Sequence, residues 1–200
     1  FKGGLSKPTY LIAAPDRRLV MRRKPHGKLL PSAHAVAREY RVLEALSRQN
    51  FPVATPLLYC ADEAVIGTPF YVMDFVDGRV FWEPAMPQSQ PAERAAVYDA
   101  MNATLARLHG FDPAALGLAD FGRGENYVAR QVVRWSTQYR ASQTEPIDAM
   151  EQLIDWLPRH LPPPAPVRLV YGDFLLDTRM IAAGAPQVLA VLDWELSTLG

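Results

Sequence analysis

"VYGDFLLDT" at residues 170–178 and "VLAVLDWE" at residues 188–195 each carry an apolar run into an acidic residue. The first run leads to Gly172-Asp173, and the second leads to Asp193. Strands of this composition belong in a core, which does not accept unpaired carboxylates. A hard cation such as Mg²⁺ binds one or two carboxylates together with the phosphates of its ligand. We therefore expect two buried, neighbouring strands whose ends bring Asp173 and Asp193 to one divalent cation and its phosphate-bearing ligand.

The composition excludes several classes of protein. Lys plus Arg equals Asp plus Glu at 21 each, so no global field gathers nucleic acid or an anionic membrane. No apolar run approaches the roughly 18 residues of a membrane span, and the opening "FKGGLSKPTY" lacks the layout of a signal peptide. Cys60 is the only cysteine, which excludes an intramolecular disulfide. We expect a cytoplasmic protein with neither nucleic acid nor a membrane as its partner.

The first part of the chain has the pattern of a mixed sheet with one helix. Runs rich in apolar and aromatic residues predict strands at 8–13, 17–23, 56–60 and 70–76. Between the second and third of these runs, apolar residues with a spacing near 3.6 predict a helix over 33–48.

The second part changes to helices. Apolar spacing predicts helices over 91–109, 126–140 and 146–157, and their stripes of large side chains are expected to lie in the core. The first of these helices is expected to stop at Gly110, a residue suited to a left-handed cap. The prolines of "LPPPAP" at 161–166 end the helical run and predict a stiff connector.

The two acidic segments together resemble the catalytic segment of the aminoglycoside phosphotransferase and choline kinase group. "VYGDFLLDT...VLDWE" is similar to that group's pattern H-G-D-x-x-x-x-N followed by a strand and [IV]-D-[WFY]-E. Further stretches resemble one subgroup, the kinase-like domains found alone in bacteria or fused ahead of acyl-CoA dehydrogenase modules: "GTPFYVMDFVDGRVFW", "YDAMNATLARLH", "ARQVVRWSTQYRAS" and "LDWELSTLG". The resemblance covers nearly the whole chain.

The resemblance implies an α+β, protein-kinase-like fold with two lobes. Residues 1–76 would form a small nucleotide-binding lobe with a mixed or antiparallel sheet, and residues 77–200 a larger, mainly helical lobe with the catalytic loop and the metal-binding strand. Because the chain begins at Phe1 and stops directly after an apolar strand, we expect the helical lobe to be truncated at its C-terminal end.

The resemblance also implies roles in the catalytic segment. Asp173 matches the aspartate that orients the acceptor hydroxyl and takes its proton. Asp193 matches the aspartate that holds Mg²⁺ against the phosphates of ATP, and Thr178 stands where the pattern has a metal-binding Asn. Tyr171 stands where the pattern has His. A threonine side chain is shorter than that of asparagine, although its hydroxyl does ligate Mg²⁺ in P-loop enzymes. The departure therefore predicts weakened activity and leaves both an impaired enzyme and a domain without phosphoryl transfer as alternatives.

A second set of residues matches the nucleotide site of the family. Arg22 sits where the phosphate-binding cation is expected, with Arg23 and Lys24 as rivals. Glu39 matches the helix glutamate that pairs with this cation; the alternative is a solvated helix charge. Lys7 replaces an Asn that is usual in the subgroup's glycine turn. The remaining expected nucleotide-binding residues come from that turn and from the linker between the lobes: Gly3, Gly4, Ser6, Met73, Asp74, Phe75 and Val76.

Two functions follow from the resemblance. The first is an ATP- and Mg²⁺-dependent phosphotransferase acting on the hydroxyl of a small molecule. The second is a degraded kinase-like domain that binds nucleotide or acyl-CoA without phosphoryl transfer. The segment "RQVVRWSTQYR" is basic and aromatic, which favours a hydroxyacyl-CoA acceptor over a polycationic aminoglycoside. A fused or associated acyl-CoA dehydrogenase module is the expected protein partner.

Overall fold

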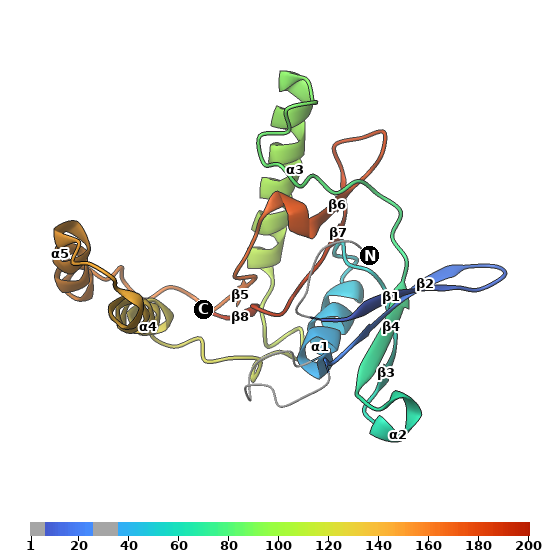
Figure 1. Ribbon diagram of the computed structural model, residues 1–200, viewed down its shortest axis with the longest axis horizontal. Helices are drawn as coiled ribbons and strands as arrows, with labels where there is room; N and C mark the ends of the chain where they lie inside the picture. The colour runs from blue at the N-terminus through green and yellow to red at the C-terminus, as the bar shows by residue number, and fades with distance from the viewer. Residues whose placement is uncertain (1–6, 26–35) are drawn as a thin grey trace.

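The computed structural model describes residues 7–25 and 36–200. The expected glycine-turn residues Gly3, Gly4 and Ser6 lie outside these described residues. Figure 1 shows a sheet on one side of the molecule, a long helix on the other, and short strand pairs between them.

The first part of the chain forms a four-stranded sheet in the order β1-β2-β4-β3, with antiparallel neighbours throughout. Arg22 lies opposite Thr9 on one neighbouring strand and opposite Tyr71 on the other, so Arg22 occupies an inner strand of the sheet. The strands agree closely with the predicted ranges and are β1 (Thr9–Ala13), β2 (Arg18–Arg23), β3 (Pro56–Cys60) and β4 (Phe70–Asp74).

Helix α1 (Val36–Ser47) covers this sheet and packs on β3 and β4. Its buried face includes Val36, Leu43 and Leu46, at the three- and four-residue spacing of one helix face. Glu39 belongs to the same face and is buried with its apolar neighbours. A carboxylate is thereby placed under the sheet, where it needs a partner.

The helical part contains α3 (Pro91–Gly110), α4 (Tyr127–Ser142) and α5 (Asp148–Trp156), near the predicted positions; a single-turn helix, α2 (Glu63–Ile66), precedes β4, and a short 3₁₀ turn, η1 (Leu157–Arg159), follows α5. The prediction of a left-handed cap at Gly110 is wrong. Gly110 is the last helical residue, and Phe111 ends the helix in extended conformation with φ −75°. Since an extended cap residue also ends the helix, no positive φ is required at this point.

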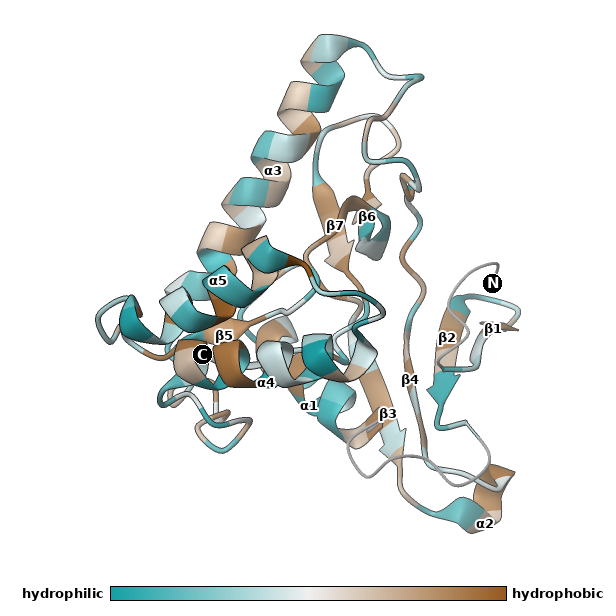
Figure 2. Cartoon of the chain, turned by 60° about the vertical axis from the view of Figure 1, so that its left-hand side comes forward, coloured by the Kyte–Doolittle hydropathy of each residue, from teal (hydrophilic) through white to brown (hydrophobic). Residues whose placement is uncertain are grey.

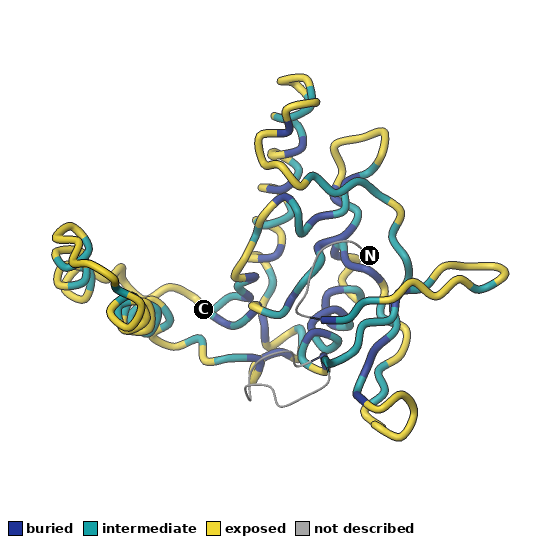
Figure 3. Tube along the Cα trace, viewed as in Figure 1, coloured by how far each residue is buried: buried dark blue, intermediate teal, exposed yellow. Residues whose placement is uncertain are grey.

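The expected burial of the helix stripes is correct for α3 but wrong for α4 and α5. Helix α3 buries Val97, Met101 and Leu108, whereas α4 and α5 bury no residue. Figures 1 and 3 show α4 and α5 projecting from the rest of the molecule, largely exposed. Trp135 of α4 is 57% exposed. An amphipathic period identifies a helix but does not supply the surface that covers it.

The two apolar runs that predicted the metal site are not neighbouring strands. β5 (Leu169–Val170) pairs with β8 (Thr198–Leu199), and β7 (Val188–Val191) pairs with β6 (Arg179–Ile181). The first run is interrupted because Gly172, at φ +95°, turns the chain out of the extended conformation. A 3₁₀ turn, η2 (Leu176–Thr178), then leads into β6.

The core joins the sheet to the short strand pairs around Trp194, which is 1% exposed. Its ring meets Phe51, next to the first sheet, and Tyr171, after β5, in edge-on contacts. Figure 2 shows the apolar character of β3 and β7, in contrast with the alternating surface of α3. No helix among the described residues is long and apolar enough to cross a bilayer.

Candidate active site

The loop that carries Asp173 is shaped by Gly172. A Cβ at Gly172 would lie 2.7 Å from the Leu196 carbonyl oxygen, and the backbone has φ +95°, so glycine is required on both grounds. The next residue, Asp173, is exposed, and its carbonyl oxygen accepts a hydrogen bond from the Leu175 N–H at 2.9 Å. A tight loop thus holds the predicted base at the surface, where a substrate hydroxyl can reach it.

Hydrogen bonds join this loop directly to the segment that carries Asp193. The Leu192 N–H donates to the Thr178 carbonyl oxygen at 2.9 Å. The Tyr171 hydroxyl donates to the Leu192 carbonyl oxygen, and burial raises the pKa of Tyr171 to about 12, which keeps this donor protonated. The segment with Asp173 and the segment with Asp193 are therefore held together by hydrogen bonds from the loop at 171–178 and by the pairing of β6 with β7. Strands β5 and β7 do not pair with each other. The meeting of the two carboxylates around one metal ion stays a prediction.

The negative charge of the Asp193 carboxylate is only partly compensated by neighbouring residues. Asp193 has φ +56°, an unusual conformation for a non-glycine residue. Burial raises its pKa, with Glu195 and Glu39 adding to the shift and Arg22 opposing it. Arg22 Nη1 lies 3.6 Å from its Oδ1. A divalent cation would compensate this charge more fully than Arg22 alone does, so Asp193 fits the expected metal-binding role.

The predicted pairing of Arg22 with Glu39 is confirmed. Arg22 Nη1 lies 2.5 Å from Glu39 Oε1, which also accepts the Trp194 N–H at 3.2 Å. Glu39 is 2% exposed, so the alternative of a solvated helix charge is wrong. The rival Arg23 is engaged elsewhere, with the Tyr10 hydroxyl. Arg22 is therefore the cation that strand geometry directs to the site.

Lys7 is a site residue that sequence reasoning missed. It is 4% exposed, and its Nζ lies 3.2 Å from Glu39 Oε2 and 3.2 Å from Glu195 Oε2. Burial alone would raise the pKa of Glu39, but Arg22 and Lys7 outweigh burial and hold it below the ordinary value. The only sequence signal was the departure of Lys7 from the usual Asn of the glycine turn.

A cavity of about 190 Å³ lies between the first sheet and the catalytic segment. It brings Arg22 together with the predicted linker residues and with Asp177 of the catalytic loop. Sequence reasoning had not assigned Val80, Trp82 or Asp177 to the site. The full lining is Thr9, Val20, Arg22, Ala54, Met73, Asp74, Phe75, Val76, Val80, Trp82, Asp177, Met180 and Leu192. This mainly apolar slot, with the Arg22 cation in its lining, suits a flat base attached to phosphates.

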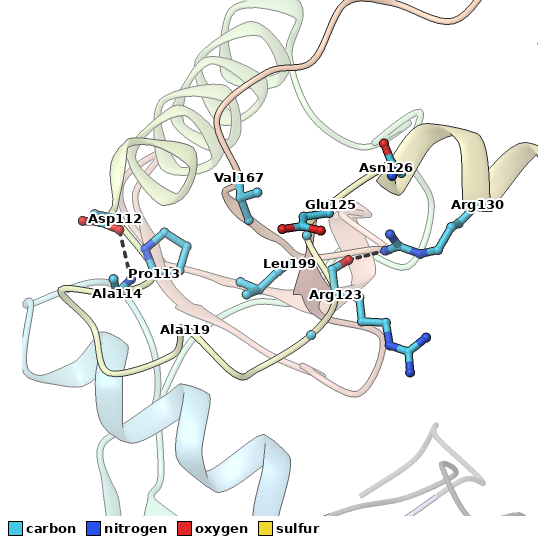
Figure 4. Close-up of a pocket in the computed structure, with 12 residues that line it drawn as sticks. Asp112, Pro113, Ala114, Ala119, Arg123, Glu125, Asn126, Arg130, Val167 and Leu199 are labelled. Atoms are coloured by element: carbon cyan, nitrogen blue, oxygen red, sulfur yellow. Dashed lines mark hydrogen bonds between the residues drawn. The ribbon is translucent and has the colours of Figure 1, made fainter.

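A larger cavity of about 650 Å³ lies elsewhere, between the segment after α3, the start of α4 and the strand pair β5–β8 (Figure 4). Its polar lining includes Asp112, Arg123 and Glu125, and the Arg130 guanidinium donates to the Arg123 carbonyl oxygen. None of the predicted site residues within 7–25 and 36–200 lines it. We therefore take the smaller cavity as the candidate active site, because Arg22 and the predicted linker residues line it.

Thr178 is the predicted metal ligand whose surroundings fit least well. Its hydroxyl donates to the Leu175 carbonyl oxygen at 3.0 Å. The Arg179 guanidinium contacts the same hydroxyl and donates to the Thr178 carbonyl oxygen at 2.9 Å. Within residues 7–25 and 36–200, no cluster of three or more His, Cys, Asp or Glu side chains could hold a metal ion by itself. A metal in this site would therefore rely on phosphate oxygens as well as Asp193.

The family model of the phosphotransferase enzyme family matches residues 1–200. Among curated relatives, acyl-CoA dehydrogenase family member 10 of Mus musculus is 50% identical over the whole chain, and family member 11 of Homo sapiens is 45% identical. The chain spans only 19% and 26% of these two proteins. The subgroup resemblance seen in the sequence is thus confirmed.

Solved structures with a similar fold include known and assigned phosphotransferases. A Ralstonia eutropha protein assigned as an aminoglycoside phosphotransferase has 48% identity and a TM-score of 0.89, over all of this chain and 59% of its own. The type VIII aminoglycoside-3'-phosphotransferase, at 18% identity and a TM-score of 0.65 over 98% of this chain and 70% of its own, shares the fold. The predicted protein-kinase-like α+β fold is confirmed, while its division at residue 76 stays a prediction. The chain belongs to the phosphotransferase enzyme family.

Proposed function

We propose that this chain transfers a phosphoryl group from ATP to the hydroxyl of a small molecule, with Mg²⁺ as cofactor. The observation that carries the proposal is the ion-paired group of Arg22, Glu39 and Asp193, of which Arg22 lines a slot together with the linker residues Met73 to Val76. Phosphoryl transfer depends mainly on positioning and electrostatics, and this group supplies both.

The nucleotide would bind in the 190 Å³ cavity. The backbone of Met73 to Val76 would meet the adenine edge, and Arg22 would bind the phosphates while Glu39 holds its guanidinium in place. The expected turn residues Gly3, Gly4 and Ser6 would cover the phosphates. Solved relatives support nucleotide use, since an aminoglycoside phosphotransferase of the same fold was crystallised with AMP-PNP and hygromycin B.

Asp193 would hold the metal ion, and bound Mg²⁺ would neutralise charge on the transferring phosphates. Asp173 would orient the acceptor hydroxyl and accept its proton at a carboxylate oxygen. The exposed position of Asp173 after the Gly172 turn allows such contact. Thr178 stands at the sequence position of the family's second metal ligand, but its hydroxyl is already hydrogen-bonded within the loop.

A hydroxyacyl-CoA is the acceptor class that we favour. Curated relatives are named acyl-CoA dehydrogenase family members, and this chain matches only part of their length, which supports an associated dehydrogenase module. Helix α4 adds an exposed basic and aromatic surface, with Arg134 over Trp135. An aminoglycoside acceptor is the less favoured choice. We keep a cytoplasmic location as part of the proposal.

The second candidate function is binding of nucleotide or acyl-CoA without phosphoryl transfer. The hydrogen-bonded Thr178 hydroxyl favours it, because that side chain is less available to a metal ion than a free ligand would be. In this case the cavity would still accept a nucleotide, since its lining does not include Thr178.

The deciding experiment follows phosphate from labelled ATP into hydroxyacyl-CoA and aminoglycoside acceptors. Asp173→Asn is expected to lower transfer by about 10²- to 10⁴-fold, the usual contribution of a general base, with nucleotide affinity unchanged. Asp155→Asn, which changes an exposed aspartate on α5, is the matched control. Nucleotide binding without transfer in the wild type would establish the second function. Equal transfer by wild type and Asp173→Asn would refute the catalytic assignment.

A further inference from the structure

We propose that Arg179 is a positioning residue that locks Thr178 into the catalytic loop, so that the site takes one divalent cation, on Asp193. This inference rests on the proposed nucleotide- and metal-dependent function and specifies its metal requirement. Protein kinases, by comparison, hold two Mg²⁺ ions, one on an aspartate and one on a catalytic-loop asparagine.

The first step is the hydrogen bonding of Thr178. A threonine hydroxyl has one hydrogen to donate and two lone pairs. Its hydrogen is shared between the Leu175 carbonyl oxygen at 3.0 Å and the more distant Asp173 carbonyl oxygen at 3.5 Å, and the Arg179 Nη1 contacts the same hydroxyl oxygen as a donor. A metal ion on the remaining lone pair would share one oxygen atom with a guanidinium, placing two positive charges side by side. Thr178 is therefore a poor ligand for a cation.

The second step is the position of the guanidinium itself. Arg179 is 0% exposed, and its Cζ lies 3.5 Å from the centre of the Phe174 ring and 4.6 Å from that of Tyr171. Both rings belong to the loop that holds Asp173. Cation–π contacts of this kind offset part of the cost of desolvating the guanidinium and fix its position between the two rings. The loop is thus built around a fixed positive charge.

The third step concerns incomplete pairing. Among the described residues, Arg179 Nε and Nη2 have no hydrogen-bond partner, and neither does the buried Asp177 Oδ1. Leaving buried donors unpaired is costly, so an apolar side chain would suit the fold better than Arg179 does. Arg179 also interacts electrostatically with Asp173 and Asp177, the acidic groups of this loop. The charge of Arg179 thus lies among the acidic groups of the loop, where it opposes the binding of a second metal ion.

The test counts protein-bound Mn²⁺ by equilibrium dialysis with excess AMP-PNP. We expect one Mn²⁺ per wild-type chain and two in the double variant Thr178→Asn/Arg179→Leu, which restores a carboxamide and removes the competing cation. Thr178→Asn alone is the matched control and should stay at one, because Arg179 still contacts the side-chain oxygen at position 178. Two ions on the wild type, or one on the double variant, would overturn the proposal.

Thr178→Ala provides a check that does not depend on folding of the double variant. If Thr178 does not bind the metal ion, the Mn²⁺ affinity of this variant in the presence of AMP-PNP should stay within about twofold of wild type, and a tenfold loss contradicts the inference.

Amide hydrogen exchange of the nucleotide-free protein tests the positioning role of Arg179 separately. Arg179→Leu should speed exchange at residues 175–178, whereas Arg159→Leu, an exposed control, should not. Unchanged exchange rules out the lock; failure of the wild type to retain Mn²⁺ with AMP-PNP counts against the proposed function instead.

Discussion

Lys7 and Arg179 are both buried cations next to the candidate active site, but they are paired very differently. The Lys7 ammonium lies 3.2 Å from each of two carboxylates, Glu39 and Glu195, on elements far apart in the chain. The Arg179 guanidinium contacts its sequence neighbour Thr178 and two aromatic rings, and two of its nitrogens have no hydrogen-bond partner in the part of the chain that the structure describes. A buried charge therefore indicates different things in the two places. At Lys7 it connects parts of the fold, and at Arg179 it shapes one loop.

The largest effect is expected from Glu39→Ala. This change leaves both Lys7 and Arg22 without their shared buried carboxylate, and breaking a buried ion pair typically costs about 3–5 kcal/mol. The free energy of unfolding from urea titration should fall by at least that amount. Glu44→Ala, on the exposed side of the same helix, is the control and should change stability by less than about 1 kcal/mol. Similar losses of unfolding free energy in the two variants would contradict the conclusion that the buried ion pairs of Glu39 stabilise the fold.

Lys7→Met should have the next largest effect. Glu39 keeps Arg22 and the Trp194 N–H, so the destabilisation should be smaller than for Glu39→Ala, about 2–3 kcal/mol. The double variant Lys7→Met/Glu195→Gln tests the second contact, because removing both charges of that pair should restore part of the loss. Strictly additive losses in this cycle would show that Lys7 and Glu195 do not interact in solution.

The pH dependence of stability should reveal Glu39 in its paired state. Its pKa is lower in the folded protein than the ordinary glutamate value of about 4.3, so its contribution is fully present above that value. The contribution is lost as pH falls through the folded pKa. Urea midpoints between pH 6 and pH 3 should therefore fall less steeply in Glu39→Gln, although this variant is less stable at pH 6. Parallel curves would mean that Glu39 does not titrate with a lowered pKa.

Arg179→Leu should have the smallest effect on stability and the opposite sign. Removing a buried guanidinium that has two donors unpaired among the described residues is expected to leave the unfolding free energy unchanged or to raise it by about 1 kcal/mol. Lost cation–π contacts with Phe174 and Tyr171 limit the gain. Thermal denaturation of this variant beside Lys7→Met sharpens the contrast between the two cations. A loss as large as that of Lys7→Met would show that Arg179 connects the fold as Lys7 does.

Several elements were predictable because their signals are local. The strands around Arg22 and the helix that carries Glu39 follow from short periodic patterns, whereas the Arg22–Glu39 pair was expected from the family resemblance alone. The family resemblance rested on short motifs distributed over nearly the whole chain, each readable from a few adjacent residues, and the family match confirms it. The pairing of the short strands was wrong, because a two-residue strand such as β5 carries too little pattern to specify its partner.

The sequence by itself determined the family, the helices, the sheet strands and the identity of the acidic residues, since each depends on neighbours a few positions away. Only the tertiary structure decided that Lys7 joins Glu39 to Glu195, that Arg179 occupies the Thr178 hydroxyl, and that α4 and α5 are left exposed. The physical reason is that burial and charge pairing depend on which distant surfaces meet. A periodic pattern identifies the face of an element, whereas its partner comes from another part of the chain.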